Sequence, residues 1–313
     1  MIEYSVVIPV YNNSATVREL FERLVLTFTS LGKSFEVLLI NDGSRDTSLE
    51  VLRTIATEDV RCKVLSLSRN FGQHPAICAG FENAKGSRIV LMDADLQDSP
   101  EDIPYLIRQM DESEVDVVYC IKKRGEKKFS SRITSVLYHY TFSKIVRTSV
   151  PTNVGTFRMF NRKFLDALLR FKEVEVLYGP LMFFMGFRSS FVTLDFRDRS
   201  NGKSSYTFTK RLKLAVNSLI SYTDIPHKVS IYFGSLLLFI VIVWGTTIFI
   251  QFAMLGRALP TGLTLLVLVS LISLGSILVF LGIIGTYLFR IYQEVLNRPR
   301  YLVAESFNFE GEN

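Results

Sequence analysis

Short apolar segments alternate with amphipathic segments through the N-terminal part of the chain. Segments rich in β-branched residues are predicted as strands: Tyr4–Val10, Phe35–Ile40, Lys63–Ser68 and Arg88–Met92. Helices are predicted between them, over Ser14–Leu31 and over the segments that end near Glu58 and Ala84. This alternation is typical of an α/β domain with a mainly parallel sheet and helices on both faces.

Two long apolar segments near the C-terminus, residues 229–255 and 263–289, contain no Asp, Glu, Lys or Arg. At about 1.5 Å per residue, each is longer than a hydrocarbon core of about 30 Å. A short connection with Gly and Pro joins them, so they predict a transmembrane hairpin of two helices rather than a buried soluble pair. Basic residues flank the hairpin at Lys228, Arg290, Arg298 and Arg300, whereas the connection has Arg257 alone. We therefore expect both chain ends to be cytoplasmic.

The same pattern predicts how the chain is divided. Residues 1–204 are the expected α/β domain, and residues 290–313 are a cytoplasmic C-terminal tail after the hairpin of residues 229–289. Residues 205–228 are predicted as a juxtamembrane amphipathic region, because apolar and basic positions fall on different helical faces. A soluble helix packed on the α/β domain is the alternative for this region.

Composition narrows the range of ligands. The 313 residues have a formal net charge of +6. With a membrane hairpin present, this charge favours an anionic membrane surface and a phosphorylated ligand over nucleic acid. The three cysteines and three histidines show no spacing typical of zinc sites.

An acidic loop follows the last of the predicted strands. The apolar segment Ile89–Met92 is followed by Asp93, Asp95 and Gln97, so two carboxylates and an amide lie at one strand end. These oxygen ligands suit a divalent cation such as Mg²⁺ or Mn²⁺ that also binds phosphate oxygens and water. The alternative is an acidic loop that caps a helix beginning at Pro100.

Polar residues also follow the first two predicted strands, at Tyr11–Asn13 and at Asp42. Ligands of parallel sheets bind at the carboxyl ends of the strands, so we expect these loops to share one crevice. The sequence lacks Gly-x-Gly-x-x-Gly and Gly-Lys-Ser/Thr patterns, which argues against dinucleotide and P-loop chemistry.

Six motifs in order resemble the polyprenyl-phosphate glycosyltransferases, the group with the dolichol-phosphate mannose synthase type of catalytic domain. The resemblance is stronger to bacterial members with a two-helix membrane anchor, and it spans nearly the whole chain. Its motifs lie at Val7–Asn12, Asn41–Ser44, Arg69–Gly72, Asp93–Asp98, Arg199–Tyr206 and Gly285–Pro299.

The resemblance implies a Rossmann-like GT-A domain of glycosyltransferase family 2. It implies inverting, metal-dependent transfer of a hexose from a nucleotide sugar such as UDP-glucose to undecaprenyl phosphate. The reaction would take place at the cytoplasmic face of the inner membrane, in a multi-pass protein that forms a homo-oligomer such as a tetramer.

The resemblance also assigns roles to individual residues. The residues implied around the nucleotide sugar are Pro9, Tyr11, Asn13, Asp42, Arg69 and Asp93. Those implied around Mg²⁺ or Mn²⁺ are Asp93, Asp95 and Gln97. Those implied for the lipid phosphate are Arg124, Arg132, Arg199 and Lys203, because an Arg fork pairs with phosphate oxygens. The catalytic set is Asp95, Asp93, Arg199 and Thr156.

Two positions depart from the family pattern. Relatives commonly have Glu at the position of Asn13, and an acidic residue, the usual candidate for a general base, at that of Thr156. A phosphate monoester has a second pKa of about 6, so the acceptor is already largely a dianion at neutral pH. We therefore expect attack on the anomeric carbon without a strong base, with positioning and charge screening in its place.

Two other functions fit parts of the pattern. A processive polysaccharide synthase would need a Gln-x-x-Arg-Trp segment, but the only tryptophan, Trp244, lies in the first apolar run. A nucleotide-sugar-binding pseudoenzyme or membrane scaffold would explain Asn13 and Thr156, although a scaffold has no need of the acidic loop.

Overall fold

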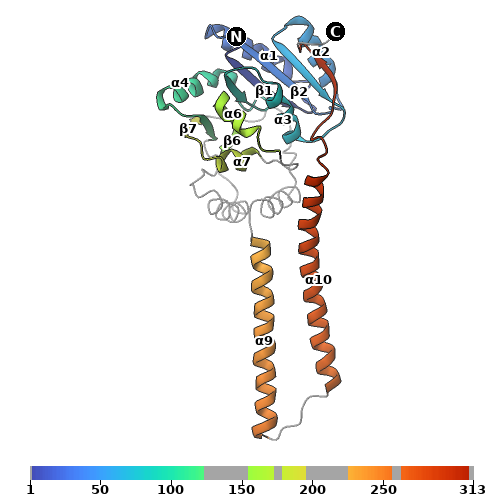
Figure 1. Ribbon diagram of the computed structural model, residues 1–313. Coiled ribbons are helices and arrows are strands. Elements are labelled where there is room, and N and C mark those ends of the chain that lie inside the picture. The colour runs from blue at the N-terminus through green and yellow to red at the C-terminus, as the bar shows by residue number, and fades with distance from the viewer. Residues whose placement is uncertain (1, 123–153, 173–177, 195–224, 256–261, 310–313) are drawn as a thin grey trace. The chain divides into compact units, whose positions relative to one another are not determined.

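A computed structural model describes residues 2–122, 154–172, 178–194, 225–255 and 262–309 (Figure 1). The chain forms two compact units. The first comprises Met1–Ser204 and Pro299–Asn313, and the second comprises Ser205–Arg298. The first contains the strands, and the second contains the two long helices.

A sheet of eight described strands forms the first unit, in the spatial order β7-β5-β6-β4-β1-β2-β3-β8. Their bounds are β1 Tyr4–Val10, β2 Phe35–Asn41, β3 Cys62–Leu67, β4 Arg88–Leu91, β5 Val117–Lys122, β6 Val154–Asn161, β7 Ser189–Leu194 and β8 Val303–Phe307. Strands β1 to β4 are parallel, and β5 is parallel to β7. Strand β6 is antiparallel to β4 and β5, and β8 is antiparallel to β3. The sheet is thus mixed but mostly parallel.

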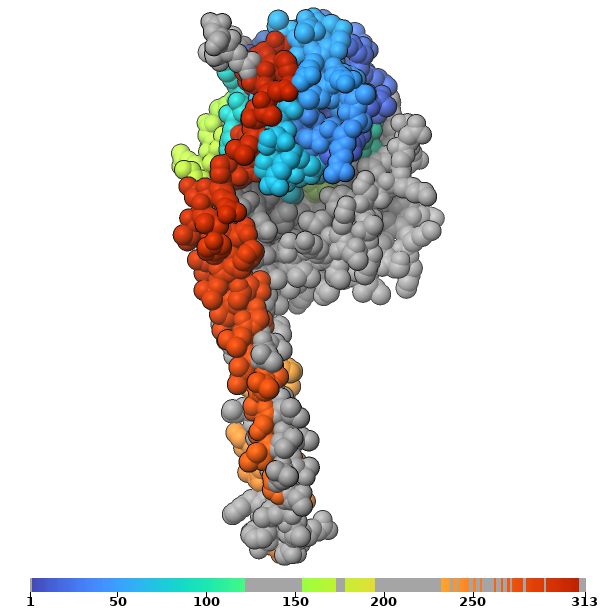
Figure 2. All heavy atoms as spheres, turned by 90° about the vertical axis from the view of Figure 1, so that its right-hand side faces the viewer, coloured from blue at the N-terminus to red at the C-terminus, as the bar shows by residue number. Residues whose placement is uncertain are grey.

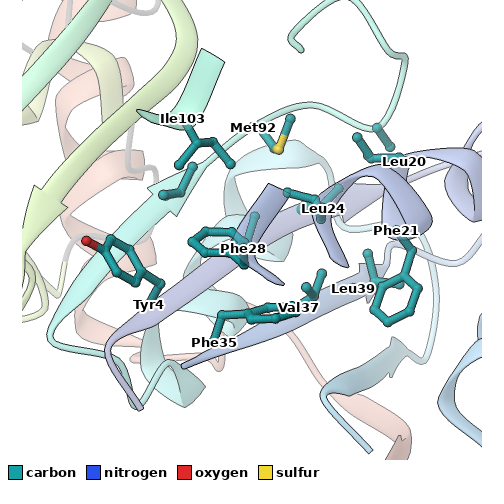
Figure 3. Packing of buried hydrophobic residues seen from close by; sticks show 14 of the residues in the cluster. Tyr4, Leu20, Phe21, Leu24, Phe28, Phe35, Val37, Leu39, Met92 and Ile103 are labelled. Carbon is teal, nitrogen blue, oxygen red and sulfur yellow. The ribbon is translucent and has the colours of Figure 1, made fainter. Parts of the chain in front are cut away.

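Helices cover both faces of this sheet. Helices α1 (Val17–Ser30), α2 (Ser48–Glu58) and α4 (Ile103–Ser113) pack on one face, and a short 3₁₀ helix, η1 (Pro100–Asp102), precedes α4. Helices α3 (Gln73–Asn83), α6 (Arg162–Leu168) and α7 (Tyr178–Phe184) pack on the other. Figure 3 shows the first interface, where the Phe28 ring of α1 stacks on Phe35 of β2 at a centroid distance of 4.8 Å. Burial of these apolar faces stabilises the unit and fixes the strand ends that carry the site.

The four strands predicted from the sequence are confirmed, with ends that shift by a residue. The predicted C-terminal tail, by contrast, includes a strand that the sequence analysis did not foresee. Strand β8 pairs with β3, and its Glu305 forms an ion pair with Arg53 of α2. The side-chain amide of Asn308 donates to the carbonyl oxygens of Ala56, at 2.6 Å, and Cys62, at 2.8 Å. Figure 2 shows this C-terminal segment, in red, lying against the blue surface of the first unit.

A buried polar network joins the central strands. Glu36 of β2 accepts hydrogen bonds from the Lys63 ammonium, at 2.6 Å, and from the Ser5 hydroxyl, at 2.5 Å. It also accepts from the backbone N–H of Lys85, at 2.7 Å, in the turn before β4. An ion pair that is buried in this way persists because both charges are compensated by hydrogen bonds.

The second unit consists of α9 (Ile225–Leu255) and α10 (Gly262–Val295) in its described part. These helices coincide with the two predicted apolar segments and extend beyond them at their outer ends. Large apolar side chains such as Phe239, Leu281 and Leu288 are exposed along them. Among the described residues, the stretch Ile272–Val295 is long and apolar enough to cross a membrane, judged by length and composition.

Candidate active site

The predicted loops meet at one edge of the sheet. Strands β1, β2, β3 and β4 are parallel, so their carboxyl ends lie together, and Val10 of β1 is in register with Asn41 of β2. The segment Tyr11–Asn13 follows β1, Asp42 follows β2, and Asp93 follows β4. The expected convergence of these loops is therefore confirmed by the sheet topology.

Hydrogen bonds connect the loops after β1 and β2. The Asn12 N–H donates to the Ser44 hydroxyl at 3.1 Å, and the Asn12 side-chain oxygen accepts from the Arg45 N–H at 2.8 Å. The Asn13 N–H donates to the Ser48 hydroxyl at 2.9 Å. These contacts fix the backbone around the Tyr11 ring, which is 41% exposed and faces solvent at this edge. Pro9, also predicted to contact the donor, is half-buried within β1.

Asp42 is buried and organises the loop after β3. Its carboxylate accepts the Phe71 N–H at 2.7 Å and the Gly72 N–H at 3.0 Å. Burial raises the pKa of Asp42, and the two backbone donors oppose that rise. The exposed guanidinium of Arg69 lies 4.6 Å from the centre of the Phe71 ring. Asp42 thereby positions Arg69 and Phe71, while its own contact with a nucleotide stays a prediction.

Gly43 allows the loops after β2 and β3 to approach each other closely. Its φ is +60°, in the left-handed region that favours glycine. A Cβ at this position would lie 2.4 Å from the carbonyl carbon of Arg69 and 2.5 Å from the nitrogen of Asn70. The Asn70 side chain in turn donates to the carbonyl oxygen of Asp42 at 3.1 Å.

Hydrogen bonds to neighbouring elements and one hydrogen bond within the loop fix the conformation of the acidic loop. The Gln73 side chain, at the start of α3, donates to Asp93 Oδ1 at 2.8 Å. The Gln97 N–H donates to Asp95 Oδ1 at 3.2 Å across Leu96, whose φ is +58°. The Thr16 hydroxyl donates to the carbonyl oxygen of Ala94 at 2.7 Å and ties the loop to the start of α1.

The capping alternative for this loop receives no support from Ser99, the residue directly before the next helix. Helix η1 begins at Pro100, and the preceding Ser99 makes no side-chain capping hydrogen bond. Asp95 instead closes a turn within its own loop. Contacts of Asp93 and Asp95 thus hold the loop, and Ser99 adds no side-chain cap to the helix that follows.

The donor set of this loop fits a hard divalent cation. Asp93, Asp95 and Gln97 are partly exposed and supply oxygen ligands. Within the described residues, no group of three or more His, Cys, Asp or Glu side chains could hold a metal ion. A cation here would therefore need further ligands from water and from a diphosphate, as Mg²⁺ and Mn²⁺ accept.

Thr156 lies at the same edge of the sheet as the acidic loop. Strands β4 and β6 are paired as far as Leu91 and Arg158. Asp93 and Thr156 each lie two residues beyond this last pair, where the strands separate. Thr156 is partly exposed, so the topology brings it to the same edge as Asp93.

Some predicted site residues lie outside the described residues. These are Arg124, Arg132, Arg199 and Lys203. The predicted amphipathic region, residues 205–228, is described only from Ile225. Conversely, Gln73 and Arg158 are close to the site and were missed, because nothing in their sequence context marks them as partners of the acidic loop.

The amino-acid sequence matches the family model described as glycosyl transferase family 2 over residues 5–169. The chain belongs to this family, and it is a glycosyltransferase with an α/β domain whose sheet is mixed but mostly parallel.

Relatives match along nearly the whole chain. The Bacillus subtilis (strain 168) protein named "Uncharacterized glycosyltransferase YkcC" is 34% identical over 99% of this chain and 96% of its own length. An undecaprenyl-phosphate 4-deoxy-4-formamido-L-arabinose transferase from Salmonella paratyphi B is 32% identical over 96% of this chain and 92% of its own length.

A solved structure also resembles this chain. Mannosyl-3-phosphoglycerate synthase from Rubrobacter xylanophilus superposes with a TM-score of 0.49 and 15% identity. The superposition covers 70% of this chain and 73% of that protein.

Proposed function

We propose that this glycosyltransferase moves a hexose from a nucleotide sugar such as UDP-glucose to polyprenyl phosphate. The observation that carries the proposal is the 32% identity, over 96% of the chain, to an enzyme whose name gives undecaprenyl phosphate as its acceptor. That match is long enough to include both apolar helices as well as the α/β domain.

The helices support a membrane-bound acceptor. A helix that is apolar on all sides is stable in a lipid bilayer or inside a large protein. Both α9 and α10 expose large apolar side chains, including Phe239 and Leu288. We infer that both cross the inner membrane and leave the two chain ends cytoplasmic, where Arg124, Arg132, Arg199 and Lys203 would bind the lipid phosphate.

The chemistry follows from the acceptor. A phosphate oxygen of the acceptor attacks the anomeric carbon from the face opposite the nucleotide, and the bond from that carbon to the diphosphate oxygen breaks with inversion. A divalent cation at Asp93 and Asp95 would supply neutralisation of the departing diphosphate. Because the acceptor is already a dianion, Thr156 has no proton to remove and contributes position only. Tyr11 and the Asp42-ordered loop with Arg69 would hold the nucleotide.

The test is transfer of radiolabelled sugar from a panel of nucleotide donors to undecaprenyl phosphate, with Mg²⁺, with Mn²⁺ and with EDTA. We expect label in the lipid phase only with metal, and loss of transfer in Asp95→Ala. Asp111→Ala is the matched control, because Asp111 is exposed on α4 and pairs with Arg88 away from the loop. Binding of nucleotides without transfer from any donor would contradict the proposal.

A second variant tests the role of Thr156. Thr156→Asp restores the acidic residue that relatives commonly have at this position. We expect turnover at neutral pH to change by less than about tenfold, because no base is needed. A rise of about a hundredfold would show that proton removal limits the reaction.

A further inference from the structure

Arg158 is a buried arginine close to the acidic loop. It lies in β6, opposite Leu91 of β4 and Tyr119 of β5, and is 6% exposed. Its Nε donates to the carbonyl oxygen of Thr156 at 2.8 Å, and its Nη2 donates to that of Gly155 at 2.7 Å.

Within the part of the chain that the structure describes, two further groups that contact this guanidinium are uncharged. Its Nη1 lies 3.2 Å from the sulfur of Met182, and its centre lies 5.5 Å from the centre of the Tyr119 ring. An arginine stays protonated even when burial lowers its pKa, as it does here. Each of its described hydrogen bonds thus ends on a neutral acceptor, and its positive charge is left to act on nearby groups. Asp93 and Asp98 are among the groups whose negative charge favours the protonated form.

The two carbonyl groups that Arg158 binds belong to a bulge in β6. Tyr119 of β5 is in register with Arg158, and Ile121 is in register with Val154. Two steps along β5 therefore correspond to four steps along β6, so that Gly155, Thr156 and Phe157 lie opposite Cys120 alone. Bulges beside active sites re-aim a side chain. Here the bulge carries Thr156, and the guanidinium of Arg158 binds its backbone.

We propose that Arg158 is a positioning residue of the transferase site, an inference that rests on the proposed function. Its planar fork holds the bulge that sets the place of Thr156 next to Asp93. Its buried charge balances part of the negative charge of the acidic loop. The two hydrogen bonds of the planar guanidinium therefore support turnover. Its positive charge repels a cation at the acidic loop, and so weakens cation binding when no diphosphate is present.

Two substitutions separate the effect of the planar guanidinium's hydrogen bonds from the effect of its positive charge. Arg158→Lys keeps the charge but cannot bind both carbonyl groups in one plane, whereas Arg158→Gln removes both. Arg162→Gln is the matched control. Arg162 lies just beyond the other end of β6, and its Nη2 likewise donates to two backbone carbonyl oxygens, those of Ala84 at 2.7 Å and Gly86 at 2.6 Å.

Two measurements on the full-length protein in detergent then test the proposal. The first is titration of Mn²⁺ alone, followed by electron paramagnetic resonance, which needs neither donor nor acceptor. The second is steady-state transfer to polyprenyl phosphate, with kcat and the donor KM determined separately. Protection of the buried thiols Cys62, Cys78 and Cys120 from labelling reports whether each variant is folded.

We expect Arg158→Gln to bind Mn²⁺ about threefold more tightly or better, because a repulsive charge is gone. Its kcat should fall by roughly thirtyfold or more, with the donor KM changed by less than about threefold. Arg158→Lys should bind Mn²⁺ like the wild type but lose about tenfold in kcat. Arg162→Gln should match the wild type in both.

Either of two results would overturn the proposal: unchanged Mn²⁺ affinity in folded Arg158→Gln, or a kcat for Arg158→Lys within about twofold of the wild type. If Arg158→Gln does not fold, the kcat of Arg158→Lys decides alone. Failure of the proposed function looks different, since the wild type itself would then transfer no sugar. The Mn²⁺ titration would still test the charge of Arg158.

Discussion

Removing the ammonium of Lys63 tests the buried network that joins the central strands. Lys63 Nζ lies 2.6 Å from Glu36 Oε2, and the two side chains are 10% and 1% exposed. Lys63→Met keeps the length and the apolar stem but leaves the Glu36 carboxylate without its counter-charge. Breaking a buried pair from one side destabilises a protein by about 3–5 kcal/mol. We expect the free energy of unfolding to fall by about 3 kcal/mol, at the lower end of this range, because Ser5 and Lys85 still donate hydrogen bonds to Glu36.

An exposed pair in the same unit supplies the matched control. Lys33 and Glu3 lie 3.1 Å apart, with side chains that are 41% and 44% exposed. Lys33→Met makes the same chemical change, but water and salt screen an exposed pair, so its loss should hardly change the stability. The difference in stability between the two variants therefore reports the effect of burial, because both variants lose a lysine charge.

The assay uses the cysteines as reporters of the first unit. All three, Cys62, Cys78 and Cys120, are buried there. Denaturant unfolding of the detergent-purified chain, followed by the reactivity of these thiols, measures the stability of that unit separately from α9 and α10. A Lys63→Met variant as stable as Lys33→Met would refute the reasoning about the buried pair.

Three further predictions use the same thiol assay. Gly43→Ala should lower the free energy of unfolding by about 2 kcal/mol or more, because φ is +60° and the new Cβ would meet the Arg69 backbone. Gly32→Ala is the control: its φ is +62° but the space around it is open, so the loss should be only about 1 kcal/mol. Burial lowers the pKa of His74 to about 4, so the native state excludes a proton that the unfolded chain binds below about pH 6.5. Stability should therefore fall by about 2 kcal/mol between pH 8 and pH 5, and a fall just as steep in His74→Gln would contradict this cause. Asn308→Ala should lower the free energy of unfolding by about 1–2 kcal/mol, because the Asn308 amide donates to backbone carbonyl groups in α2 and β3. An unchanged unfolding midpoint would mean that the C-terminal segment does not stabilise the unit.

Local pattern was enough to predict the centre of the fold. Strands β1 to β4 are mainly apolar segments between polar loops, and such segments indicate buried parallel strands on their own. Strand β8 could not be found in this way. It has only five residues, Val303–Phe307, and its pairing with β3 depends on a partner more than 200 residues away.

The candidate site likewise has features that the sequence could predict and features that it could not. The topology of a parallel sheet predicts that Asp42 and Asp93 come to one edge. The sequence could not predict that the Asp42 carboxylate accepts the backbone N–H of Phe71, since that contact depends on how the loop after β3 folds. Nor could it predict the bulge at Thr156, because a bulge appears only when the register of two neighbouring strands is known.

The identity of the nucleophile is the central claim, and one comparison tests it directly. The enzyme would be given a single nucleotide sugar with either undecaprenyl phosphate or undecaprenol, and the lipid products would be analysed by mass spectrometry. We predict a sugar-phosphate-lipid from the phosphate alone and no product from the alcohol. Equal transfer to both lipids would show that the phosphate is not the attacking group, and the account of a base-independent site with Thr156 would be wrong.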